Sequence, residues 1–303
     1  MPSTLVFILR GLPQRRIYDG DFKMRLLGSA IFLCVLSACG GGDNVAHLPY
    51  EPYADEPPPD TTTLESLMVA SSPTKSKDFY LLPDSDDYDN IPQDPLNPLT
   101  GAKVEVGKLI YHDPAFATEG IALRAKTWSC ASCHHARAGF KSGMIQGIGE
   151  GGEGFGLKGE TRGWFDPEIG TQDADVQPVT SPTILNVAFQ DVMLWNGQLG
   201  NASNGIINVG IDPEILMTEG TPKVANAEGL SGIETQAIAG TGVHRILGFP
   251  PELEDSDYYQ MLLDAFPEYS RDELHKSSTR AIAAFERTVL ANQSPFQLWL
   301  RGD

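Results

Sequence analysis

Five consecutive residues at positions 130–134 of this 303-residue chain read C-x-x-C-H. Two thiols two residues apart on one helical turn can add across the two vinyl groups of a haem, and the histidine that follows can bind the iron from the same turn. The pattern therefore predicts one covalently bound haem c, attached through Cys130 and Cys133, with His134 as axial ligand of the iron.

Two other kinds of site use closely spaced cysteines. A structural zinc site takes four ligands, typically from two cysteine pairs, and only one pair remains here once Cys34 and Cys39 are assigned to the N-terminus. A thioredoxin-like dithiol expects a βαβ pattern around it, which the flanking sequence does not show. Haem attachment is the interpretation that uses the whole motif.

Residues 1–39 are expected to be a signal peptide, with Met24 as a candidate for the true start. An apolar run over 26–36 leads into a lipobox that ends at Cys39, so cleavage removes Cys34 and makes Cys39 the lipidated first residue. The run has about eleven residues, whereas a bilayer-spanning helix needs roughly twenty. The expected location is the periplasm, with the lipid anchored in a membrane, and the outer membrane is the one we expect.

The chain carries 40 acidic and 22 basic residues, for a formal net charge of -18. A surface this acidic repels nucleic acid, so nucleic acid is not an expected partner. The charge favours either a basic redox protein steered by electrostatics or simple solubility, and the sequence does not separate these two explanations.

Residues 40–77 are rich in proline and acidic residues, and we expect a disordered tether there, followed by a haem domain over 78–303. Helices are expected after Thr100 up to Pro114, over 256–266, and over 270–290, where Ser270 and Glu273 match a capping box. No convincing alternating strand pattern appears. The expected fold class is mainly α, a cytochrome c-like haem domain with long loops.

A glycine-rich segment over 147–156 follows the haem motif and formally contains G-x-G-x-x-G. The context of a dinucleotide site is missing, because no strand precedes it and Glu150 and Glu153 would repel a pyrophosphate. We expect either a loop that needs close backbone approach or a flexible connection.

Several motifs in this order resemble the bacterial di-haem cytochrome c peroxidase and MauG family over residues 91–303. They are Gly107–Pro114, the haem motif, the glycine loop, Ser181–Asn186, Trp195–Gly197, Gln236–Ala237 and the ending from Ala281 to Gly302. The resemblance implies that His134 is the proximal ligand of the peroxidatic haem, that Trp195 lies between the two haems of the family, and that Gln236 shapes the peroxide pocket. Core packing for Trp195 and an exposed helix position for Gln236 are the alternatives.

The departures from the family pattern also carry predictions. Residues 141–243 contain no histidine that would cover the iron, so an open, five-coordinate haem is favoured. The pocket glutamate of the family falls at Ile246, and nearby His244 either replaces it as acid–base group or is only a hydrogen-bonded loop histidine. Thr180 stands where the family's calcium-binding asparagine is expected, and Asn196 replaces an aspartate, which argues against calcium.

The resemblance implies a peroxidase-like oxidoreductase that reduces hydrogen peroxide with electrons from a small donor protein, a cytochrome c or a cupredoxin. The second haem domain of the family, with its own C-x-x-C-H, is missing from these 303 residues. Two alternatives are an electron-transfer cytochrome whose iron is closed by a side chain such as Met144 or Met193, and a truncated, inactive fragment of a di-haem peroxidase.

Overall fold

The computed structural model describes residues 61–118, 120, 125–164, 174–200, 217–246 and 248–302. The predicted signal peptide and the lipidation site Cys39 lie outside these residues. Within them, no helix is both long enough and apolar enough to cross a membrane.

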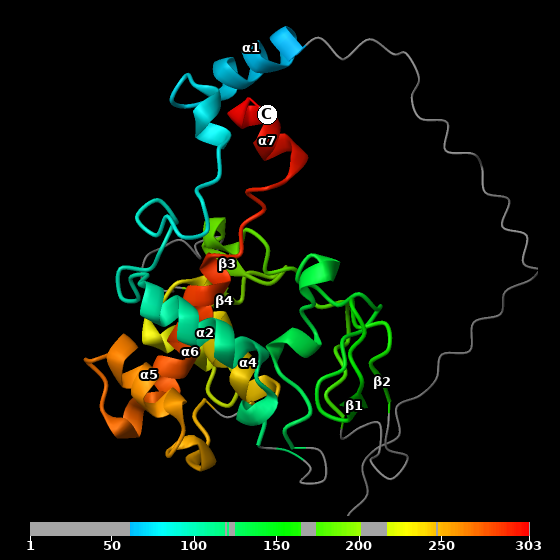
Figure 1. Ribbon diagram of the computed structural model, residues 1–303, viewed down its shortest axis with the longest axis vertical. Coiled ribbons are helices and arrows are strands. Elements are labelled where there is room, and N and C mark those ends of the chain that lie inside the picture. Colours follow the sequence, from blue (N-terminus) through cyan, green and yellow to red (C-terminus); the bar gives the residue numbers. More distant parts are fainter. Residues whose placement is uncertain are drawn as a thin grey trace, which may run out of the picture. The chain divides into compact units, whose positions relative to one another are not determined.

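Helices and long loops make up most of the described chain (Figure 1), so the predicted mainly α fold class is confirmed. The α-helices are α1 (Thr61–Ser71), α2 (Gly101–His112), α4 (Gly232–Val243), α5 (Asp257–Ala265), α6 (Leu274–Arg287) and α7 (Pro295–Arg301). Two short antiparallel pairs join β1 (Gly152–Glu153) to β2 (Gly163–Trp164) and β3 (Val192–Met193) to β4 (Leu199–Gly200). Short 3₁₀ turns connect many of these elements.

Local sequence signals explain where the predicted helices begin and end. Thr100 caps α2, its side chain accepting a hydrogen bond from the Lys103 amide, and the helix ends before Pro114. Ser270 and Glu273 form the expected capping box at the start of the segment that becomes α6. The helix expected over 256–266 is α5.

The core forms where α2 packs against α6 and α5, and where α4 packs against α6. α6 is buried from Ser277 to Arg287, and its side chains Ile282 and Phe285 join Val106 and Ile110 of α2 in one apolar cluster. α2 and α6 approach closely at Gly107, because a Cβ atom there would lie 1.8 Å from the Ala281 carbonyl oxygen. A larger residue would force the two helices apart.

The predicted tether contains one regular element that the sequence did not indicate. α1 occupies Thr61–Ser71, inside the region 40–77, and most of its side chains are exposed. The prolines that made the region look disordered end at Pro59 and resume at Pro73, so the intervening residues are free to form a helix. Within the expected tether, these eleven residues form a helix.

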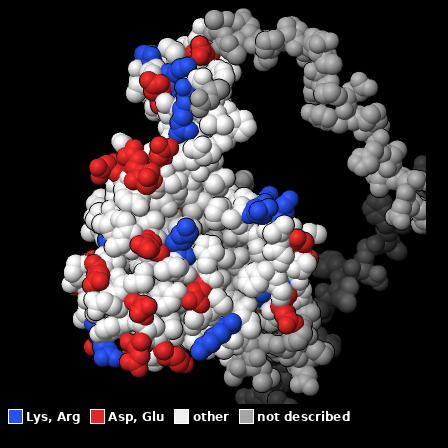
Figure 2. Space-filling view, viewed as in Figure 1, with Lys and Arg blue, Asp and Glu red and all other residues white. Residues whose placement is uncertain are grey.

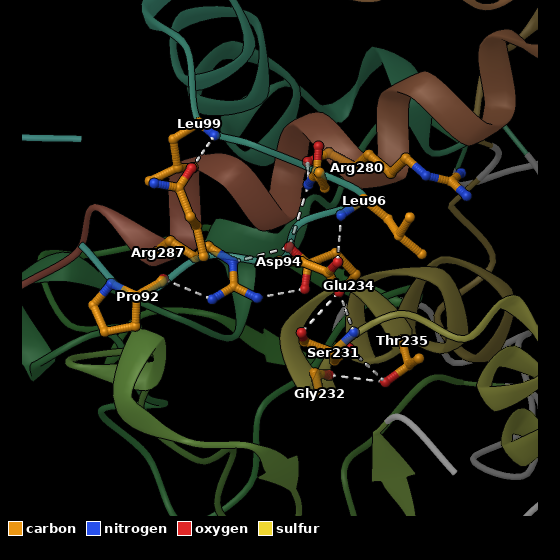
Figure 3. A network of polar contacts seen from close by, with 12 residues as sticks. Pro92, Asp94, Leu96, Leu99, Ser231, Gly232, Glu234, Thr235, Arg280 and Arg287 are labelled. Carbon is orange, nitrogen blue, oxygen red and sulfur yellow. Dashed lines mark hydrogen bonds and ion pairs between the residues drawn. The ribbon is translucent and has the colours of Figure 1, made fainter. Parts of the chain in front are cut away.

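A buried polar network pins α4 to α6 and to the segment before α2 (Figure 3). The Arg287 guanidinium donates to both carboxylate oxygens of Glu234, at 2.9 and 2.6 Å, and also to the Pro92 carbonyl oxygen. Asn97 donates to Glu234 and to the Arg280 carbonyl oxygen. Because Glu234 lies two residues before Gln236, these bonds fix the helix that carries a predicted site residue.

Candidate functional site

A cavity of about 330 Å³ lies between the haem motif and α4. Two segments more than a hundred residues apart supply most of its wall, one over 128–134 and the other over 236–246. Cys130, Cys133, His134, Gln236 and His244 all line this one cavity. Five of the six predicted haem and catalytic residues are thus brought together.

The haem motif forms a tight turn. Cys130–Ser132 is a 3₁₀ helix with Cys133 at its C-cap, and the His134 amide donates to the Cys130 carbonyl oxygen. Both cysteines are free thiols. The turn therefore presents both sulfur atoms and the imidazole to the same cavity, as covalent haem attachment requires.

The His134 ring is held by backbone oxygen atoms. Nδ1 lies 3.1 Å from the Phe140 carbonyl oxygen, which can only accept, so Nδ1 carries the proton and Nε2 holds a lone pair. Burial lowers the pKa of His134, against the opposing effect of its bonds to the Phe140 and Pro182 carbonyls. A neutral imidazole with a fixed tautomer is the form that binds a metal.

The two thiols are not poised for redox exchange. Burial raises the pKa of Cys133 to about 12, with the Asp175 charge adding to the effect, and burial also raises the pKa of Cys130 well above its usual range, with Glu286 adding. A reactive dithiol needs the opposite shift. Within the described ranges, no group of three or more His, Cys, Asp or Glu residues could hold a metal ion. The raised thiol pKa values weigh against the dithiol interpretation.

Gly147, in the glycine loop, makes a close approach to Cys133. A Cβ atom at this position would lie 2.9 Å from Cys133 Sγ and 2.8 Å from Ser181 Oγ. The backbone of the loop therefore occupies the space beside one attachment sulfur. Close backbone approach was one of the two expectations for this loop, and the structure favours it over a flexible connection.

Gln236 and His244 lie on the same face of α4, toward the cavity. Gln236, Gly240 and His244 are spaced by four residues, a spacing that places them on the same helical face, and all three line the cavity. Gln236 Oε1 is buried and has no hydrogen-bond partner within the described residues. An unpaired buried acceptor is costly, so this atom is available to a bound molecule.

His244, at the C-cap of α4, is anchored on both its backbone and its ring. Its carbonyl oxygen accepts a hydrogen bond of 2.8 Å from Trp128 Nε1, and Trp128 is buried next to the haem motif. Its ring bonds to Asp175 across the cavity wall. Ile246, at the position of the family's glutamate, also lines the cavity and offers no proton.

Trp195 does not line the cavity. It is fully exposed in the turn between β3 and β4, although its neighbour Leu194 reaches the cavity wall. Core packing of Trp195 is therefore wrong. Met144 and Met193 do not line the cavity either, and Met193 packs against Gly232 instead. The structure thus gives no support to either methionine as an iron ligand.

Sequence analysis missed two acidic residues in the cavity wall, Asp175 and Glu286. Glu286 lies on α6, and burial raises its pKa to about 8, with the Glu234 charge adding and Arg287 opposing. Its position inside the motif that ends the family resemblance was a usable signal. Asp175 lies in no motif, and only the fold brings it to His244.

Residues 101–303 match the sequence profile of the family described as di-haem cytochrome c peroxidase. The chain belongs to this family. The predicted resemblance is confirmed, and with it a haem cofactor, because the family binds haem. The residues fit that group, since two free thiols, an imidazole whose Nδ1 bonds to a backbone carbonyl and an unpaired amide oxygen share one cavity.

Curated relatives show how far the likeness extends. The chain is 27% identical to cytochrome c peroxidase Ccp of Escherichia coli (strain K12) over 206 residues, which cover 68% of this chain and 32% of the relative. It is 24% identical to cytochrome c551 peroxidase of Pseudomonas aeruginosa, and the match covers 68% of this chain and 44% of that protein. It is 22% identical to methylamine utilization protein MauG of Methylorubrum extorquens, and the match covers 71% of this chain and 46% of that protein. The chain thus spans about a third to a half of the length of these relatives.

Among solved structures, a MauG-like protein associated with microbial copper homeostasis matches with a TM-score of 0.40 and 20% identity. The match covers 74% of this chain and 50% of the other chain.

Proposed function

We propose that this protein is a periplasmic haem c peroxidase-like oxidoreductase that reduces hydrogen peroxide with electrons from a small redox protein. One observation carries the proposal: Gln236 and His244 face the same cavity as Cys130, Cys133 and His134. Family membership supports peroxidase chemistry. The haem, when bound, supplies a redox-active iron that accepts peroxide oxygen.

The chain's own residues bind and orient the substrate. Cys130 and Cys133 would hold the haem by thioether bonds, and His134 would bind its iron. Gln236, which could not be told from an exposed helix residue by sequence, has its Oε1 buried and unpaired, so it can accept a hydrogen bond from a peroxide hydroxyl. His244 moves the proton, because its imidazole lines the cavity and an imidazole can act as a general acid or base.

Electrons reach the site from outside the chain in this proposal. Trp195 is exposed, and its sequence neighbour Leu194 lines the cavity. The Trp195 ring is therefore the surface group through which electrons enter in this proposal. The donor is a basic cytochrome c or cupredoxin, and acidic side chains gather around α5 on the face seen in Figure 2. The lipid on Cys39 holds the protein at a membrane, as the lipobox implies.

The absorption spectrum of the purified haem protein tests this function. We expect a high-spin ferric iron that binds carbon monoxide when reduced, and donor-dependent peroxide reduction that falls on Gln236→Ala. Gln190→Ala, at an exposed position outside both the cavity and α5, is the matched control and should leave turnover unchanged. A low-spin iron that binds neither carbon monoxide nor peroxide would establish the electron-transfer alternative instead.

A further inference from the structure

The ring of His244 has one well-defined partner. Nδ1 lies 2.8 Å from Asp175 Oδ2, and the two side chains are 29% and 11% exposed. A carboxylate can only accept, so Nδ1 carries the proton and the Nε2 atom of the neutral ring holds a lone pair. None of the residues that the structure describes hydrogen-bonds to Nε2, and the side chain lines the cavity.

Asp175 is itself held in place from several directions. Gln177 Nε2 donates to Asp175 Oδ1 at 3.1 Å. The same Nε2 lies 3.2 Å from His244 Nδ1, but Nδ1 cannot accept from it while it donates to Asp175. The Gly149 amide donates to the Asp175 carbonyl oxygen, and the Asp175 amide donates to the Glu150 carbonyl oxygen. The glycine loop and the Asp175 segment therefore form a short ladder.

Gly149 explains why the loop needs a glycine beside this carboxylate. A Cβ atom at Gly149 would lie 2.3 Å from Asp175 Oδ2, the atom that bonds to His244. That distance is too short for any real contact, so a side chain would push the carboxylate away from the ring. Within the described part of the chain, no other basic side chain lies within ion-pair distance of Asp175.

We infer that Asp175 is a positioning residue of the peroxide reaction, which holds His244 with its Nε2 lone pair available to the cavity. This inference rests on the proposed function and deepens it. Ile246 stands at the position of the family's glutamate, and here the acid–base unit is the pair of His244 and Asp175. The glycine loop makes room for Asp175 at Gly149.

The pair acts on one proton. Nε2 takes a proton from hydrogen peroxide as it binds and returns it to the oxygen that leaves as water. While His244 carries both ring protons, the Asp175 carboxylate stabilises its positive charge through Nδ1–H. The whole reaction consumes hydrogen peroxide, two protons and two electrons from the donor protein, and yields two water molecules.

The test compares Asp175→Asn with wild type by two measurements on the haem protein. The C–O stretching frequency of the reduced carbon monoxide complex reports hydrogen-bond donors in the cavity. The stopped-flow rate of the haem absorption change with peroxide reports the reaction. The asparagine amide would donate to Nδ1 and move the ring proton to Nε2. We expect a lower C–O frequency and a rate reduced by about 10²-fold or more.

Two further variants separate positioning from general damage. Gly149→Ala should displace the carboxylate and slow the reaction in the same way, whereas Asp86→Asn, at an exposed site with no hydrogen bond of its own among the described residues, should match wild type. In a His244→Ala background, Asp175→Asn should have no additional effect, because Asp175 acts through the ring.

An unchanged C–O frequency and an unchanged rate in Asp175→Asn would overturn the inference. So would a full additional loss of rate in the His244→Ala background. A wild-type protein that fails to react with peroxide would overturn the proposed function, and the C–O frequencies would still show whether Asp175 sets the tautomer of His244.

Discussion

Glu286 should make the stability of this protein fall as pH rises, and Glu286→Gln should remove that fall. The side chain is buried in the wall of the cavity, on α6. Burial raises its pKa from 4.5 to about 8, the nearby Glu234 charge adds to this effect, and Arg287 opposes it. The folded protein therefore keeps this carboxyl group protonated at neutral pH, whereas the unfolded chain does not.

The sign follows from proton linkage. Above pH 4.5 the unfolded chain loses the proton that the folded protein retains, so rising pH favours unfolding until the folded group also ionises near pH 8. The stabilising contribution of Glu286 is fully present below pH 4.5 and is lost between pH 4.5 and about pH 8. At 1.36 kcal/mol per pKa unit, the difference corresponds to about 3 to 5 kcal/mol.

Urea unfolding at pH 5 and at pH 8 measures this loss. Glutamine has nearly the same shape as glutamic acid and cannot ionise. Between pH 5 and pH 8, the free energy of unfolding of Glu286→Gln should therefore rise by about 3 to 5 kcal/mol relative to that of wild type. Glu252→Gln, at an exposed site, is the matched control and should follow wild type at both. If the free energies of Glu286→Gln and wild type change in parallel, the carboxyl group is ionised in the folded protein and the reasoning fails.

Two further substitutions test the packing around the site. Glu234→Gln leaves the buried Arg287 guanidinium without its carboxylate. It should cost about 3 to 5 kcal/mol, or roughly 6 to 20 °C in Tm by calorimetry. Arg271→Ala, which breaks an exposed pair with Glu254, should leave Tm close to that of wild type. Gly147→Ala places a methyl group against Cys133 Sγ and should reduce the amount of covalently bound haem seen on a denaturing gel. Gly163→Ala, where a methyl group would meet open space, is the control and should keep full haem attachment. Full haem attachment in Gly147→Ala would contradict the proposed role of this glycine.

Signals that act over a few residues could be read from the sequence. The start of α2 after Thr100, the capping box at Ser270 and the turn of the haem motif each depend on contacts within one turn, and each is found where the sequence predicts it. α4 is different, because its twelve residues include three glycines and no clear apolar stripe. It is a helix because Glu234 bonds to Arg287 and because α6 covers one of its faces, and neither contact has a local signature.

The same limit explains what could be predicted of the site. His244 was identified as a candidate acid–base group because of its place beside the missing glutamate, but a lone histidine in a loop has no defined tautomer. Asp175, 69 positions earlier in the sequence, fixes the tautomer of His244 by bonding to Nδ1. Gly149 must lack a side chain for that contact to form. The glycines that formally match a nucleotide motif thus serve two close approaches, one to an attachment sulfur at Gly147 and one to a carboxylate at Gly149. Since both approaches join segments distant in sequence, the glycine pattern showed that backbone space was needed but not which atoms would occupy it.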